Sequence, residues 1–208
     1  MPALERLIAG FKIFKLEHYE HRPEMFASLV TDGQRPEVLV IACSDSRVDP
    51  AILLRARPGE LFVVRNVANL VPPHNPDKQH HGTSSALEFG VRDLGVKHIV
   101  VLGHSRCGGI QALRNYQDEP TRQGDRQFIA SWVAIAAPAL ARCDCAGGDM
   151  SALEQAAIGV SLANLRGFPW IAERMAAGTL KLHGWWFDLE GGALWAHDQA
   201  TGGFNQLA

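Results

Sequence analysis

The chain has 208 residues, 20 of them basic and 22 acidic, which gives a formal net charge of −2. This length suffices for one substantial hydrophobic core, so we expect a single domain over residues 1–208. The sequence contains no basic run that could follow a phosphate backbone, which argues against a nucleic-acid partner. Charges in the first fifteen residues and the lack of a long apolar stretch predict a cytoplasmic protein without membrane contact.

The first thirty residues carry apolar side chains at helical spacing. Leu4, Leu7, Ile8 and Phe11 fall on one face of a helix, and a charged cluster at residues 17–22 interrupts the pattern. The spacing predicts an N-terminal helical arm over residues 1–30, of the kind that packs on the outside of a domain or on a neighbouring subunit.

The central block alternates between predicted strands and helices. One helix is expected to begin at Asp49-Pro50, where an Asp cap precedes a proline, and another at the capping-box pair Ser85 and Glu88. Continuous apolar runs separated by helices are typical of a parallel sheet with helices on both faces. The runs that we interpret as strands are residues 38–42, 61–65 and 99–103.

The remainder of the chain is expected to be helical as far as Gly167 and then to form strands. Ser151 and Glu154 make a second capping-box pair in the helical part. Residues 180–189 and 193–197 flank a Glu-Gly-Gly turn and predict an antiparallel hairpin. The predicted fold is therefore α/β, with a mainly parallel central sheet flanked by helices and an antiparallel edge strand.

Two short motifs follow predicted strands. Cys43 lies directly after the first strand, and His104 and Cys107 follow the strand that ends at Gly103. Open α/β sheets carry their active sites at the carboxyl ends of the strands. Two thiolates and one imidazole are a ligand set suited to Zn²⁺, and three protein ligands leave a fourth position for chemistry.

Asp45 and Arg47 follow Cys43 at two-residue intervals, which allows two arrangements. In the first, Arg47 binds the Asp45 carboxylate in a forked contact and holds it off the metal, so that Asp45 accepts a hydrogen bond from zinc-bound hydroxide. In the second, Arg47 turns away and Asp45 becomes the fourth ligand, which closes the site. The sequence leaves both open.

Two further features of the motifs bear on chemistry. Gly108 and Gly109 follow the last ligand and let the backbone approach a small anion closely, so the free N–H groups of a helix that begins there would help to bind an anionic substrate or product. Two thiolates offset the charge of zinc and weaken the acidification of bound water, which predicts activity that rises toward alkaline pH.

The chain has four cysteines, too few for a disulfide scaffold in a protein of this length. Cys143 and Cys145 lie one residue apart in a polar, Gly-rich segment, which we interpret as an incidental exposed pair. Of the four cysteines, only Cys43 and Cys107 therefore enter the metal prediction.

These motifs resemble those of the β-class carbonic anhydrases over nearly the whole chain. The resemblance implies reversible hydration of carbon dioxide to bicarbonate by a zinc lyase (carbonate dehydratase), with zinc on Cys43, His104 and Cys107 and the dyad Asp45–Arg47. It also implies a homodimer or a dimer of dimers. The segments that carry the resemblance are residues 43–47, 58–60, 65–69 and 103–109.

The family contains a subtype in which the Asp can ligate zinc, marked by a Trp three residues before the first ligand, a Gly one before it and a C-terminal Tyr. This chain has Val40, Ala42 and Phe187 there, which favours the subtype with open zinc. The resemblance implies that substrate is bound by a lining similar to that subtype's: Gln34, Phe62, Val67 and Phe89.

The mechanism that we hypothesise is attack of zinc-bound hydroxide, oriented by Asp45, on carbon dioxide in an apolar pocket lined by Phe62, Val67 and Phe89. Gln34 is expected to hydrogen-bond substrate or product. The alternatives are a carbonyl sulfide or carbon disulfide hydrolase on the same scaffold, and a non-catalytic bicarbonate-responsive zinc protein with Asp45 on the metal.

Overall fold

The computed structural model describes residues 2–77, 79–119, 121, 124, 126–142 and 149–208. The chain divides into two compact units, Met1–Arg35 and Pro36–Ala208, and each is described by itself. Within the described residues, no helix has both the length and the apolar character needed to cross a membrane.

The first unit is helical. It consists of α1 (Ala3–Lys15), a π-helical turn η1 (Leu16–Glu20) and α2 (Pro23–Thr31). The helix breaks within the predicted charged cluster, and Pro23 opens α2 at its first turn, where its missing N–H costs nothing. Tyr19 and Phe26 stack with ring centroids 4.6 Å apart. The predicted apolar face of α1 is exposed within the chain, so this unit presents hydrophobic side chains outward.

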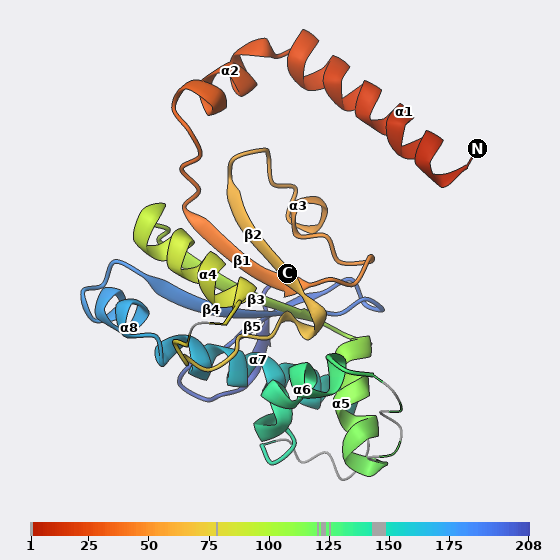
Figure 1. The fold of residues 1–208 in the computed structure, drawn as a ribbon, viewed down its shortest axis with the longest axis vertical. Helices are drawn as coiled ribbons and strands as arrows, with labels where there is room; N and C mark the ends of the chain where they lie inside the picture. The colour runs from red at the N-terminus through yellow and green to blue at the C-terminus, as the bar shows by residue number, and fades with distance from the viewer. Residues whose placement is uncertain (1, 78, 120, 122–123, 125, 143–148) are drawn as a thin grey trace. The chain divides into compact units, whose positions relative to one another are not determined.

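The second unit is built on a six-stranded sheet in the order β2-β1-β3-β4-β5-β6 (Figure 1). The first four strands in this order are parallel, β5 is antiparallel to β4, and β6 is antiparallel to β5. This confirms the predicted fold class and the C-terminal hairpin, whereas β6, the edge strand, was not predicted. The strands are β1 (Val38–Cys43), β2 (Leu61–Asn66), β3 (His98–His104), β4 (Lys181–Phe187), β5 (Leu194–His197) and β6 (Phe204–Gln206).

Helices cover the sheet and extend beyond its carboxyl edge. The main core lies between one sheet face and side chains of α4, α7 and α8, including Leu87, Ile158 and Ile171. A second cluster, which includes Cys43 and Cys107, lies under α5 and α6. The helical segments are α3 (Pro50–Leu53), η2 (Val67–Asn69), α4 (Gly82–Glu88), η3 (Phe89–Asp93), α5 (Gly108–Asp118), α6 (Ile129–Val133), η5 (Ala134–Ala139), α7 (Met150–Arg166) and α8 (Pro169–Ala176).

The predicted helix starts have different outcomes. Asp49 caps α3, accepting the N–H groups of Ala51 and Ile52, as expected. The capping box at Ser85 is wrong because α4 already begins at Gly82. The capping box at Ser151 is also wrong: Asp149 caps α7 by accepting the N–H groups of Ser151 and Ala152, which leaves the carboxylate of Glu154 free for the core.

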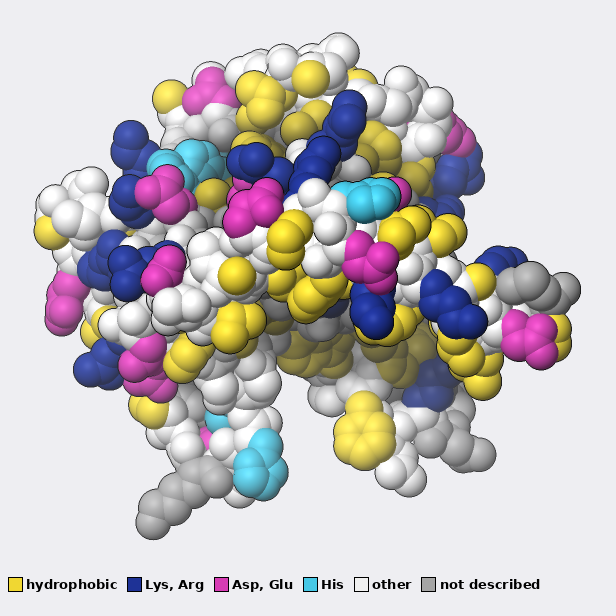
Figure 2. Space-filling view, turned by 90° about the horizontal axis from the view of Figure 1, so that it is seen from above, with side chains coloured by type: hydrophobic (Ala, Val, Ile, Leu, Met, Phe, Trp, Pro, Cys, Tyr) yellow, Lys and Arg dark blue, Asp and Glu magenta, His cyan; other side chains and the backbone are white. Residues whose placement is uncertain are grey.

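The sheet register brings the two sequence motifs together. β1 pairs in parallel with β3, Ala42 lying opposite Leu102, so Cys43 and His104 end adjacent strands. On the face drawn in Figure 2, basic and acidic side chains are interspersed with hydrophobic ones. The fold thus places the chemistry at the carboxyl edge of the sheet.

Candidate metal centre

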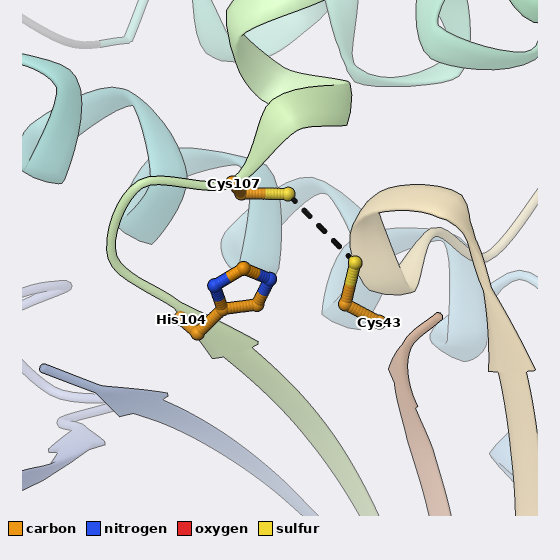
Figure 3. Close-up of side chains that lie close together, drawn as sticks. All are labelled: Cys43, His104 and Cys107. Atoms are coloured by element: carbon orange, nitrogen blue, oxygen red, sulfur yellow. Dashed lines mark hydrogen bonds between the residues drawn. The ribbon is translucent and has the colours of Figure 1, made fainter. Parts of the chain in front are cut away.

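Three side chains converge at the carboxyl edge of the sheet. Cys43 comes from the end of β1, His104 from the end of β3, and Cys107 from the residue that precedes α5 (Figure 3). Their ligand atoms all lie within 4.8 Å of one another, and all three residues are buried. The structure therefore brings together the three predicted metal ligands.

The geometry of the group fits zinc. The sulfurs of Cys43 and Cys107 are 3.9 Å apart, close to the roughly 3.8 Å that two ligands of a tetrahedral zinc at about 2.3 Å would span. Nδ1 of His104 lies 2.8 Å from the Ser105 carbonyl, to which it can donate, while the buried Nε2 has no partner. A ring anchored through Nδ1 offers its Nε2 lone pair to a metal.

The electrostatic environment favours a thiolate on Cys43. Its contact with the Cys107 thiol, more than any other, lowers the pKa of Cys43 to about 4, against the opposing effect of burial. The same contact and burial raise the pKa of Cys107. Burial lowers the pKa of His104, but contacts with Cys43 and the Ser105 carbonyl outweigh it, and the pKa is raised. A cluster that contains a thiolate and a free imidazole nitrogen is suited to bind a divalent cation.

The backbone around the sulfurs is closely fitted. The N–H of Ala68, a residue with φ of 66°, donates to the Cys43 sulfur at 3.4 Å. The N–H groups of Ile110 and Gly109 lower the pKa of Cys107. A Cβ on Gly109 would lie 2.6 Å from Cγ1 of Val67, so only glycine fits there. The N–H groups at the amino end of α5 thus interact with the Cys107 sulfur, and Gly108 is exposed beside it.

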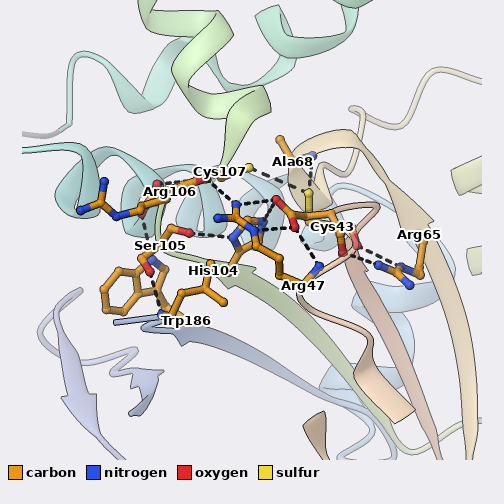
Figure 4. A network of polar contacts seen from close by, with 12 residues as sticks. Cys43, Arg47, Arg65, Ala68, His104, Ser105, Arg106, Cys107 and Trp186 are labelled. Carbon is orange, nitrogen blue, oxygen red and sulfur yellow. Dashed lines mark hydrogen bonds and ion pairs between the residues drawn. The ribbon is translucent and has the colours of Figure 1, made fainter. Parts of the chain in front are cut away.

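Asp45 and Arg47 form the forked contact of the first predicted arrangement, and Figure 4 shows Arg47 within the polar network around Cys43 and His104. Nε and Nη2 of Arg47 donate to the two Asp45 oxygens at 2.9 and 2.7 Å, and the backbone N–H of Arg47 donates to Oδ1 at 2.9 Å. Hydrogen bonds from Arg47 hold the pKa of Asp45 well below its usual range. Oδ2 of Asp45 lies 3.9 Å from Nε2 of His104. The carboxylate is therefore ionised and restrained beside the metal ligands.

Arg65 organises the same loop, a role that the sequence did not reveal. Its guanidinium donates to the carbonyls of Cys43 and Asp45 at 3.0 and 2.7 Å, and to the carboxylate of Asp49 at 2.9 Å. It thus ties β2 to the loop that carries the first ligand. The only sequence signal was its place in the segment 65–69.

Glu154 of α7 is a second residue that sequence reasoning missed. Its side chain is buried, with the residue 3% exposed, and it accepts the backbone N–H of Cys107 at 2.9 Å and Nε1–H of Trp186 at 3.2 Å. Burial raises the pKa of Glu154, and these two donors offset only part of the effect. Glu154 fixes the ligand loop from behind.

The predicted substrate-binding residues do not all lie at this site. Val67 lies against Gly109, beside the metal ligands. Phe62 pairs with Leu39, four residues before Cys43 on β1, which is roughly 13 Å along the strand.

Phe89 accompanies Phe62, their ring centroids 6.0 Å apart, and Phe62 packs on the main core rather than on the cysteine cluster. A single chain therefore does not bring Phe62 and Phe89 to the metal centre, contrary to the pocket that we expected. Gln34 is exposed in the first unit. The substrate roles of these residues stay predictions, and Cys143 and Cys145 lie outside the described residues.

Comparison with known proteins identifies the family. A family model described as carbonic anhydrase matches residues 38–194. The chain is 39% identical over 209 residues to beta carbonic anhydrase 3 of Arabidopsis thaliana, covering 97% of this chain and 80% of the relative. The chain belongs to the β-class carbonic anhydrases.

Other relatives agree with this assignment. This carbonic anhydrase is 41% identical to the chloroplastic beta carbonic anhydrase 5 of the same plant, covering 88% of this chain but 60% of the relative's length. Its fold matches the β-carbonic anhydrase CcaA with a TM-score of 0.85 at 30% identity, covering 99% and 92% of the two chains. A carbonic anhydrase of Sordaria macrospora matches with a TM-score of 0.75 at 25% identity, covering 100% and 98%.

The family and the centre together define the activity. The protein is a zinc-dependent enzyme that hydrates carbon dioxide reversibly to bicarbonate. Its zinc chemistry falls to the part of the chain where two cysteines and a histidine converge, since these supply the thiolate and imidazole ligands that zinc prefers.

Proposed function

We propose that this carbonic anhydrase works with an open zinc site, in which Cys43, His104 and Cys107 hold the metal and Arg47 keeps Asp45 off it. The observation that carries the proposal is the forked contact, in which Arg47 donates to both carboxylate oxygens of Asp45. Nη2 of Arg47 also donates to the Arg106 carbonyl at 3.1 Å, which fixes the guanidinium against the second ligand loop. A carboxylate restrained in this way is a poor fourth ligand.

Zinc bound at such a site would make water nucleophilic near neutral pH and would polarise an oxygen of the substrate. The side chains of the protein orient the reacting water. Oδ2 of Asp45 lies beside the predicted metal ligands and is placed to accept a hydrogen bond from the reacting water. This hydrogen bond would direct the water's lone pair toward the substrate. Because Arg47 keeps Asp45 ionised, the carboxylate acts as an acceptor throughout the neutral range.

We further propose that Phe62 and Phe89 complete the substrate pocket of a second copy, making the enzyme a homodimer or a dimer of dimers. Within one chain the pair lies far along the sheet from the ligands, yet Phe89 is 45% exposed. The carbonic anhydrases of Sordaria macrospora are described as tetrameric, which supports an assembly of this kind. Gln34 is proposed to act in the same way.

X-ray absorption at the zinc edge, recorded at pH 7 and 8.5 on the wild type and on Asp45→Asn, tests the open site. We expect the two proteins to give the same spectrum with two sulfur ligands, since Asp45 does not touch the metal. Loss of an oxygen ligand on substitution would contradict the proposal. Stopped-flow hydration of carbon dioxide, beside carbonyl sulfide hydrolysis in the same preparation, checks that carbon dioxide is the preferred substrate.

A further inference from the structure

A second cavity lies away from the zinc ligands, between helix α7 and the antiparallel strands β5 and β6. Its volume is about 510 Å³, and it is lined by Arg142, Gln155, Arg166, His197 and Phe204, among others. Gln155 and Arg166 come from α7, whereas His197 and Phe204 come from the two strands. The cavity thus lies between α7 and the antiparallel end of the sheet, and none of these four residues contacts the metal ligands.

The polar groups in this cavity lack protein partners. Arg142 and Arg166 are exposed to solvent at the mouth of the cavity, and over the residues that the structure describes neither these side chains nor that of Gln155 takes part in a hydrogen bond or ion pair. Nδ1 of His197 is buried and also without a partner. A buried imidazole nitrogen left unsatisfied costs stability, and such a group calls for an explanation.

The charge of the cavity has one sign. Its described lining contains two guanidinium groups and no carboxylate. Asp198, next to His197, uses its Oδ1 to accept the N–H of Ala200 at 2.8 Å within the turn. Burial lowers the pKa of His197 and the nearby Arg166 lowers it further, against a smaller opposing effect of Asp198, which favours the neutral ring, and a neutral ring can donate through Nδ1.

We propose that this cavity binds a small molecule through its phosphate group. Two guanidinium groups, an amide and an imidazole provide donors from four side chains, which suits the several oxygens of a phosphate better than the two of a carboxylate. The cavity is larger than a phosphate ion, and Phe204 and Leu162 give it an apolar wall. The ligand is therefore a phosphomonoester with a compact organic part, and the site is separate from the reaction that the zinc centre performs.

Isothermal titration calorimetry of the zinc-loaded protein tests the proposal, with inorganic phosphate, adenosine monophosphate and bicarbonate as the three probes. The double variant Arg142→Gln/Arg166→Gln removes both charges from the cavity. The matched control is Arg92→Gln, whose guanidinium is paired with Glu88 elsewhere on the surface. Zinc content and carbon dioxide hydration are measured on each protein and are expected to be unchanged, because none of these arginines contacts the metal ligands.

The wild type and Arg92→Gln are expected to bind the phosphomonoester more tightly than inorganic phosphate. The double variant should lose about tenfold or more in affinity for both. Absence of saturable binding in the wild type would overturn the site. Equal binding by the double variant would place the anion elsewhere, such as at zinc. Binding of bicarbonate in preference to either phosphate would overturn the ligand class.

Discussion

The two ends of the parallel strands differ in how completely one chain furnishes them. At the carboxyl end, Asp45, Arg47 and Glu154 are each held by hydrogen bonds in the described structure. At the amino end, Phe62 and Phe89 form a ring pair of which Phe89 stays 45% exposed. A single chain thus supplies all the residues of the metal centre, whereas the partly exposed aromatic pair is typical of an interaction surface.

Changes at the two ends of the strands should therefore have different consequences. Substitutions at the carboxyl end should affect zinc and the chemical step within the same chain. Substitutions at the amino end should leave zinc in place and affect the site of another copy.

Replacing a metal ligand should have the largest effect. Cys107→Ser removes one of two thiolates, so zinc content should fall to a small fraction of one per chain and activity should disappear with it. Because binding of the metal is coupled to folding, the thermal midpoint should also fall. Elemental analysis, hydration assays and calorimetry on one preparation measure all three. Full zinc content in this variant would show that the ligand set is misassigned.

Asp45→Asn should retain zinc and lose about a hundredfold in kcat, since the amide is a poorer acceptor and also presents a donor. Ser46→Ala, an exposed neighbour in the same loop, is the control and should keep wild-type activity. Stopped-flow hydration at pH 8.5 is the measurement. An Asp45→Asn protein with wild-type turnover would remove Asp45 from the mechanism.

Glu154→Gln tests the residue behind the ligand loop. Cys107 and Trp186 donate to different oxygens of Glu154, and the amide replaces one of these oxygens by an NH2 group, so one donor loses its acceptor and we expect zinc affinity to fall by about 10- to 100-fold. The free energy of unfolding should fall by roughly 1–3 kcal/mol. Competition with a chelator and urea unfolding supply the two values. The exposed Glu173→Gln serves as control, and equal zinc affinity in both variants would argue against this role.

The pH dependence reports on the carboxyl end. Arg47 lowers the pKa of Asp45, so this carboxylate is charged at every pH above the ordinary Asp pKa of about 4. Its protonation therefore does not limit activity near neutral pH. The two thiolates offset the charge of zinc, so activity should rise by about tenfold between pH 6.5 and 9. A flat profile, or a fall toward alkaline pH, would contradict this view of the centre.

Phe62→Ala/Phe89→Ala tests the amino end. The double substitution removes two apolar side chains from the proposed substrate pocket, so kcat/KM should fall by about tenfold. Zinc content should stay at the wild-type level. Zinc analysis and steady-state kinetics on the same sample provide the check. A protein without zinc would mean that the pair supports the centre of its own chain.

The sequence predicted the parts of this site that depend on short-range pattern. Apolar runs located β1 and β3, and the residues that end these strands, Cys43 and His104, therefore met as expected. The edge strand β6 was missed because three residues carry too little alternation to be distinguished from a loop.

The remaining misses arose from long-range contacts. The local sequence predicts that Glu154 is half of a capping box, but Asp149 caps the helix and Glu154 accepts the N–H of Cys107, 47 residues away. Arg65 acts on Cys43 and Asp45 only through the parallel pairing of β2 with β1. The positions of Phe62 and Phe89 depend on the sheet register, which the motif around Cys43 does not encode.

Subunit mixing tests the division between the two ends most directly. Asp45→Asn and Phe62→Ala/Phe89→Ala are unfolded together, refolded with zinc and assayed for carbon dioxide hydration. If the aromatic pair acts on the other copy, each mixed dimer contains one intact site, and the mixture should reach roughly a quarter of wild-type activity. Activity no higher than the mean of the two variants would contradict a site shared between two copies, because it would place the aromatic pair and the metal centre in the same functional chain.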